Sequence, residues 1–151
     1  IMDMAITHPD SKILNDFGKI QSPVEIPENK RDYVNIKKNL NSNEMKEFYR
    51  DIDVLLIPIA DEGVGRMTLE AMSCGTPVIM LGNYERYPID HMSNGFLISN
   101  DFSNIDTVIE MITNNPDQLK DLGLKSRKTI EKEYSNKVLM SKLKTIYASL
   151  L

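Results

Sequence analysis

The chain has 151 residues, of which 41% are hydrophobic and 26% are charged, a composition that excludes a disordered or fibrous protein. Its formal net charge of −4 excludes a broad basic surface for nucleic acid, so any anionic ligand has to be bound locally. Cys74 is the single cysteine, which excludes an internal disulfide and favours a reducing cytoplasmic setting. Because the sequence contains neither a membrane-spanning apolar run nor a signal peptide, we expect a soluble protein.

The first third of the chain predicts two strands and a helix. Residues 12–17 form the first candidate strand, which Gly18 ends, and residues 33–36 form a second, short one. Ser42 to Glu44 is typical of a helix start, and the apolar residues between Met45 and Ile52 recur at helical spacing.

The middle of the chain predicts a strand, a helix and a second strand. Residues 54–59 and 77–81 are near-continuous apolar runs, which is typical of strands covered on both faces. Residues 66–74 between them are good helix formers, and the following Gly75-Thr76-Pro77 suits a helix exit.

The last third predicts a short strand over residues 95–98 and then helices over residues 105–112, 119–133 and 137–150. Alternation of strands and helices indicates a parallel sheet with helices on both faces. We therefore expect a single Rossmann-like, three-layer α/β domain over residues 1–151.

The loop after Ile59 is the candidate site, because ligands of open parallel sheets bind at the carboxyl ends of the strands. Gly63 and Gly65 allow close backbone approach, and the helix start behind them favours phosphate. Glu62 and Glu70 flank this position, and their carboxylates can accept hydrogen bonds from sugar or ribose hydroxyls. A nucleotide sugar fits this pattern, although a purely structural turn explains the residues equally well.

Residues 62–79, EGVGRMTLEAMSCGTPVI, closely resemble the signature of family-four retaining glycosyltransferases, in which Glu-x7-Glu leads into Glu-Ala-Met and Gly-x-Pro-Val. The resemblance covers about residues 33–150 and implies the carboxy-terminal, donor-binding domain of the two-domain GT-B fold. On this interpretation the chain is a fragment that lacks the start of this domain and the amino-terminal acceptor domain.

The resemblance also implies the roles of individual residues. Glu62, the implied catalytic residue, contacts hydroxyls of the donor sugar, and Glu70 holds the ribose. The main chain faces the diphosphate and sugar at Gly63, Val64, Gly65, Arg66, Met67 and Thr68. The nucleobase is lined, largely through main chain, by Lys38, Asn39 and Leu40. Neither a metal nor another cofactor is implied.

By resemblance, the full-length protein is a retaining hexosyltransferase that transfers sugar from a nucleotide-diphosphate sugar to a saccharide or lipid-linked acceptor. We expect the protein to act in polysaccharide or cell-envelope biosynthesis in the cytoplasm. Peripheral association of the full-length protein with the inner face of the membrane is a further alternative. The expected partners are the donor and the acceptor domain, not nucleic acid, and the fragment alone is expected to be inactive. The alternatives are a non-catalytic nucleotide-sugar-binding or scaffold domain that pairs with a catalytic subunit, and a nucleotide-sugar epimerase of the same fold.

Two departures from the family pattern concern the donor. In relatives, an arginine and a lysine early in this domain neutralise the diphosphate. None of the early basic residues of this chain matches those roles; they are Lys12, Lys19, Lys30 and Arg31. Ile59 stands where a serine is common, which leaves the donor sugar undetermined. His91, in a later loop, is interpreted as exposed and non-catalytic.

Overall fold

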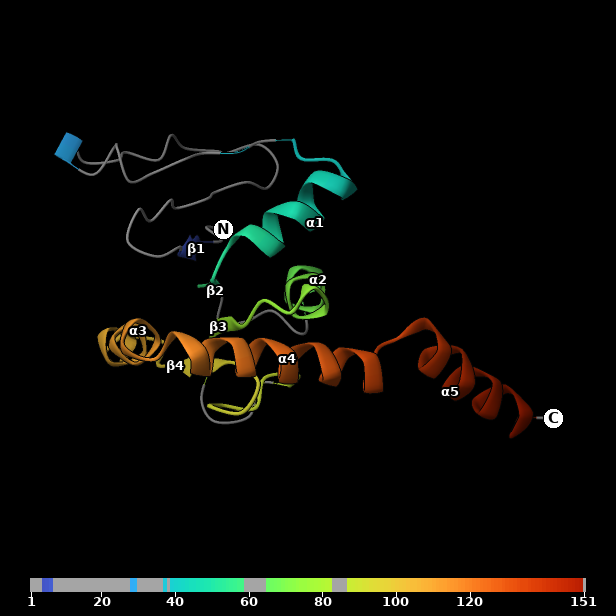
Figure 1. Ribbon diagram of the computed structural model, residues 1–151. Helices are drawn as coiled ribbons and strands as arrows, with labels where there is room; N and C mark the ends of the chain where they lie inside the picture. Colours follow the sequence, from blue (N-terminus) through green and yellow to red (C-terminus); the bar gives the residue numbers. More distant parts are fainter. Residues whose placement is uncertain are drawn as a thin grey trace.

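The computed structural model describes residues 4–6, 28–29, 37, 39–58, 65–82 and 87–150. Their helices and strands are, in chain order, β1 (Met4–Ile6), α1 (Ser42–Asp51), β2 (Val54–Ile57), α2 (Arg66–Cys74), β3 (Val78–Leu81), β4 (Phe96–Ile98), α3 (Ile105–Asn114), α4 (Pro116–Glu133) and α5 (Asn136–Ala148) (Figure 1). The strands predicted at residues 12–17 and 33–36 lie outside the described residues.

The sheet has the strand order β1-β2-β3-β4. Strands β2, β3 and β4 are parallel, with Leu55 opposite Val78 and Ile79 opposite Phe96, as the buried apolar runs predict. Strand β1 pairs antiparallel with β2 and was not predicted, because three residues are too short to show a strand period.

Helices cover both faces of this sheet, which confirms the predicted α/β layout. Side chains alternate along a strand, so Leu55 and Ile57 of β2 face one way and Val54 and Leu56 the other. The first pair packs in a buried cluster with residues of α1 and α2, together with Ile130 of α4. The second pair packs in a cluster with residues of α3 and the first half of α4.

The helix boundaries follow local chemistry. Helix α2 occupies the predicted residues 66–74, and its exit has the paired hydrogen bonds of a Schellman motif, Thr76 N to Ala71 O and Gly75 N to Met72 O, both 3.0 Å. Gly75 has φ +85°, which a glycine adopts without strain. Helix α4 begins three residues before its predicted start, because Pro116 is pre-organised for the first helical position.

The exit of α2 lies directly against α4. A Cβ atom added to Gly123 of α4 would lie 2.1 Å from the carbonyl oxygen of Gly75, a distance that no packed structure accommodates. The backbones of α2 and α4 therefore touch at this point. Because α2 begins at the candidate site, this contact also determines where the site lies relative to the sheet.

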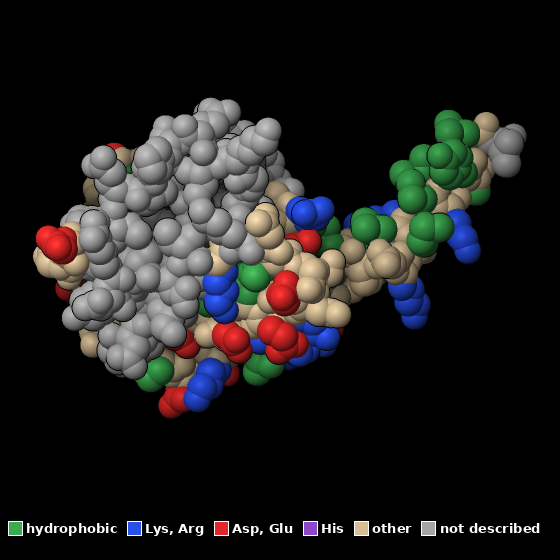
Figure 2. All heavy atoms as spheres, turned by 90° about the horizontal axis from the view of Figure 1, so that it is seen from above, with side chains coloured by type: hydrophobic (Ala, Val, Ile, Leu, Met, Phe, Trp, Pro, Cys, Tyr) green, Lys and Arg blue, Asp and Glu red, His purple; other side chains and the backbone are tan. Residues whose placement is uncertain are grey.

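Helix α5 extends away from the rest of the described structure (Figure 1). Its hydrophobic side chains gather along one side and remain exposed (Figure 2); they are Leu139, Met140, Leu143, Ile146 and Tyr147. None of its residues is buried. Among the described residues, no helix combines the length and apolar character that crossing a membrane requires.

We predict that Gly123→Ala lowers the free energy of unfolding by about 1–3 kcal/mol, because the new methyl group overlaps the Gly75 carbonyl. Helix propensity alone predicts the opposite sign, a gain of up to about 1 kcal/mol for replacing glycine by alanine. Chemical denaturation of the variant distinguishes the two. Lys128→Ala, an exposed position on the same helix, is the control and should change stability by less than about 0.5 kcal/mol; a stabilised Gly123→Ala variant would contradict the backbone contact.

Candidate functional site

The start of α2 lies at the carboxyl edge of the sheet, because α2 is the helix that follows the parallel strand β2. Gly65 is its N-cap residue, with φ −68° and ψ 145°, and Leu69 N donates to Gly65 O at 3.3 Å in the first helical bond. The predicted residues Glu62, Gly63 and Val64, like Lys38, lie outside the described residues.

Among the described residues, side chains cap the N-terminus of α1 and none caps that of α2. In α1 the Asn41 Oδ1 atom accepts from the amides of Asn43 and Glu44, and the Glu44 carboxylate accepts from Asn41 N at 2.8 Å. In α2 the cap is Gly65, which has no side chain, and the first turn contains no acidic residue. No described side chain caps the first amides of α2, and these amides with the helix dipole suit an anionic ligand.

Glu70 lies one turn further along α2, and both oxygens of its carboxylate have a partner. Its Oε1 atom is 3.2 Å from Arg66 Nε, and its Oε2 atom accepts a hydrogen bond of 3.2 Å from the Tyr49 hydroxyl. The Glu70 side chain is 41% exposed and that of Arg66 is 85% exposed. A carboxylate that is accessible to a ligand is thus held in place from two sides.

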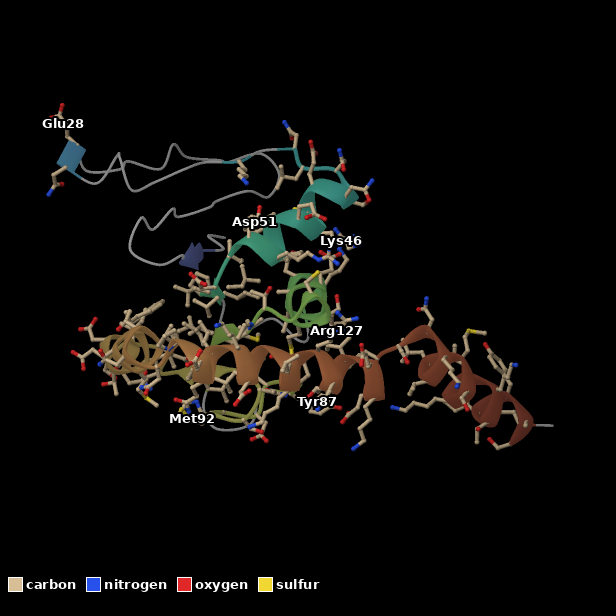
Figure 3. The ribbon with its side chains drawn as sticks, viewed as in Figure 1. Glu28, Lys46, Asp51, Tyr87, Met92 and Arg127 are labelled. Atoms are coloured by element: carbon tan, nitrogen blue, oxygen red, sulfur yellow. The ribbon has the colours of Figure 1, made fainter. Side chains whose placement is uncertain are left out.

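Tyr49 was not among the predicted site residues. The sequence pattern identifies it as a core position of α1, and it is indeed 1% exposed, with its ring centroid 5.4 Å from that of Phe48. Its hydroxyl nevertheless reaches the site, and its carbonyl accepts a hydrogen bond from the Thr76 hydroxyl. Side chains of α1 fill the space between α1 and α2 in Figure 3. A buried tyrosine on an amphipathic helix gives no sequence signal for such a contact.

Two further predicted residues of α2 direct their side chains into the protein. Thr68 is fully buried, and its hydroxyl lies 3.7 Å from Met80 Sδ on the sheet. Met67 packs partly buried against the same cluster. The buried Thr68 side chain supports the helix, so any contact of Thr68 with a ligand is made by its main chain, whereas the Met67 side chain remains half-buried.

The predicted nucleobase segment is described at two of its three positions. Asn39 has φ +56°, in the left-handed region that asparagine tolerates better than most residues. Leu40 is half-buried and packs against the cluster that also includes Met67 and Leu69 of α2. The segment therefore enters α1 from the side of the sheet on which α2 lies.

Two other polar residues of the described region, His91 and Arg127, make structural contacts. His91 is exposed, and its Nδ1 atom accepts a hydrogen bond of 2.9 Å from Leu97 N. Arg127, on α4 (Figure 3), pairs with Glu131 at 2.8 Å, and this pairing raises the pKa of the Arg127 guanidinium. The described residues include no group of three or more His, Cys, Asp or Glu side chains placed to hold a metal ion.

Comparison of sequences shows a family match over more than half of the chain. Residues 17–114 match the family described as Glycosyl transferases group 1. The capsular polysaccharide biosynthesis glycosyltransferase CapM of Staphylococcus aureus is 27% identical over 145 residues, which are 89% of this chain and 37% of that relative. The chain thus spans well under half the length of this curated relative.

Comparison of structures shows the same fold in longer proteins. Sucrose-phosphate synthase from Thermosynechococcus elongatus superimposes with a TM-score of 0.73 at 22% identity, over 81% of this chain and 31% of that one. Anabaena HepE, in a complex with UDP-glucose, gives a TM-score of 0.66 at 15% identity, over 79% of this chain and 33% of that one. The chain therefore has the Rossmann-like architecture that these proteins share.

We predict that Thr68→Val leaves the free energy of unfolding within about 1 kcal/mol of the parent, because the hydrogen bond that the structure gives this hydroxyl among the described residues is to a weakly accepting sulfur in the buried cluster. Thr68→Asp should cost several kcal/mol, since it buries a carboxylate. Thermal and chemical denaturation of both variants test the inward orientation. Tolerance of Thr68→Asp would show that the side chain faces solvent instead.

Proposed function

Because the chain belongs to the glycosyl transferases group 1 family, we propose that it is the donor-binding domain of a GT-B glycosyltransferase and binds a nucleotide-diphosphate sugar. The observation that supports this proposal best is the combination of an open helix start with a fixed carboxylate one turn away. The amides at the start of α2 suit a diphosphate, and Glu70 suits a pair of ribose hydroxyls.

The spacing within α2 supports a defined direction for the bound donor. Arg66 and Glu70 are four residues apart, about 6 Å along a helix that rises 1.5 Å per residue. This distance is comparable to the distance between the diphosphate of a nucleotide and the ribose attached to it. The diphosphate then lies at the start of α2 and the ribose beside Glu70. In this proposal Glu62, which precedes α2 in the sequence, contacts the donor sugar and is the catalytic residue.

The proposed chemistry is sugar transfer with retained configuration, in which the domain stabilises the departing nucleoside diphosphate. Amides that point at the diphosphate stabilise it most strongly in the transition state, when negative charge develops on it. The guanidinium of Arg66, 85% exposed at the start of α2, adds one positive charge nearby. Helix amides and Arg66 supply this stabilisation without a metal ion, so we propose a metal-independent transfer.

We further propose that the donor is a UDP-sugar and that the product is a polysaccharide or another cell-envelope glycan. The uridine proposal is supported by the UDP-glucose complex of HepE, and the glycan proposal by the capsular polysaccharide relative CapM. We place the reaction in the cytoplasm, where the single cysteine Cys74 stays reduced.

An acceptor-binding domain of the same polypeptide is the proposed partner. The chain spans 37% of CapM, so a relative of this kind has ample length for a second domain. The exposed apolar side of α5, which includes Leu143 and Ile146, is a surface that such a domain could cover. In this arrangement the acceptor reaches the donor between the two domains.

We predict that Glu70→Ala weakens UDP-glucose binding at least tenfold, because the ribose hydroxyls lose a charged acceptor. The measurement is isothermal titration calorimetry or ligand-observed NMR at donor concentrations up to the millimolar range. Lys128→Ala, an exposed position on α4, is the control and should bind like the parent.

Failure of the parent chain to bind UDP-, GDP- and ADP-sugars alike would contradict donor binding. Parent-like binding by Glu70→Ala would contradict the position of the site while leaving the family intact. In the full-length protein, donor binding without sugar transfer would favour a non-catalytic nucleotide-sugar-binding domain over an enzyme.

A further inference from the structure

We propose that Tyr49 is a positioning residue for donor binding, whose hydroxyl holds the Glu70 carboxylate in the orientation that accepts the ribose. This inference rests on the proposed function, since it gives Glu70 the role of ribose acceptor. The contact on which it depends is the hydrogen bond of 3.2 Å from the Tyr49 hydroxyl to Glu70 Oε2.

The geometry at Glu70 leaves acceptor capacity for a ligand. An ionised carboxylate has about four lone-pair positions, two on each oxygen. Tyr49 occupies one position on Oε2 and Arg66 one on Oε1, the latter with its Nε atom at 3.2 Å. With these two partners from the described part of the chain, each oxygen retains a lone pair, and two neighbouring acceptors match the two adjacent hydroxyls of a ribose.

The two groups that hold Glu70 differ in rigidity. The Arg66 side chain is 85% exposed, so solvent competes for its guanidinium and its long side chain is free to move. Tyr49 is 1% exposed, and its ring is fixed in the core against Phe48 at a centroid distance of 5.4 Å. The orientation of the carboxylate therefore depends mainly on Tyr49.

The backbone of Tyr49 is hydrogen-bonded to the end of α2, the helix whose start forms the proposed site. Its carbonyl accepts a hydrogen bond from the buried hydroxyl of Thr76, the residue that completes the Schellman motif at the end of α2. Helix α1 is thereby held against both the second turn of α2 and its exit. A rigid support of this kind reduces the side-chain freedom that Glu70 would lose on binding, and so favours affinity.

Replacement of Tyr49 by phenylalanine removes the hydroxyl and keeps the aromatic ring that packs in the core. Its neighbour Phe48 packs in the same cluster without a polar group. The Tyr49 hydroxyl instead meets a side chain that is 41% exposed at the start of the proposed donor site. Removing only this oxygen therefore separates the role of the ring in packing from the role of the hydroxyl in positioning Glu70.

The test compares UDP with 2′,3′-dideoxy-UDP, which lacks both ribose hydroxyls, by titration calorimetry of the parent chain and of Tyr49→Phe. We expect Tyr49→Phe to weaken UDP binding about three- to tenfold, the effect of one hydrogen bond. Binding of the dideoxy compound should change by less than about twofold, because it makes no contact through the ribose hydroxyls. In the double variant Tyr49→Phe/Glu70→Ala, UDP should bind no more weakly than to Glu70→Ala alone.

Tyr87→Phe is the matched control, since Tyr87 is 56% exposed and packs on Tyr134 with ring centroids 5.9 Å apart, away from α2. It should leave the binding of both nucleotides unchanged. Equal losses for UDP and dideoxy-UDP in Tyr49→Phe would overturn the positioning role, because a purely structural effect does not distinguish the two.

The outcomes also separate this inference from the proposed function. If the parent binds UDP, Glu70→Ala weakens it and Tyr49→Phe binds like the parent, the role of Tyr49 is overturned and the donor site stands. If the parent does not distinguish UDP from the dideoxy compound, the ribose role of Glu70 fails and the inference about Tyr49 fails with it.

Discussion

The backbone contact between Gly75 and Gly123 fixes the position of α2, and the candidate site depends on that position. A Schellman motif ends the helix at Gly75, and the glycine of α4 lets the two backbones touch. Thr76, the next residue, donates to the carbonyl of Tyr49 and so attaches α1. The helix that carries Glu70 is consequently held at its exit by α4 and along its side by α1. The start of α2, at the opposite end from these contacts, is the proposed diphosphate position.

The sequence indicates the fold well wherever a pattern is local. Near-continuous apolar runs indicate the buried parallel strands β2 and β3, and the Gly75-Thr76-Pro77 exit indicates where α2 ends. The antiparallel strand β1 is too short to produce a pattern. The contact between Tyr49 and Glu70 joins residues 21 positions apart, and the helical spacing of Tyr49 describes only its burial. A local pattern identifies which residues are buried, but tertiary packing determines which polar atoms meet.

The site residues divide into those that support the helix and those that face outward. Thr68 and Met67 follow the family signature, yet the Thr68 side chain contacts Met80 on the sheet and the half-buried Met67 packs against the same cluster. The proposed contribution of Thr68 to donor binding is therefore limited to its backbone amide. Arg66 and Glu70 share the outer side of α2 and interact with one another. The packing of each side chain explains what that residue is free to contact. The chain spans 37% of CapM, so the complete transfer reaction is proposed for a longer polypeptide in which an acceptor domain covers the apolar side of α5.

The central claim, that the start of α2 binds the diphosphate of a nucleotide sugar, is tested most directly by backbone amide NMR of the ¹⁵N-labelled chain during titration with UDP-glucose. Hydrogen bonds from amides to phosphate oxygens should produce the largest chemical-shift changes at Arg66, Met67 and Thr68, with smaller changes around Glu70. The amides of α5 (Asn136–Ala148) should not move. Saturable changes confined to other elements, with the α2 amides unaffected, would contradict the claim.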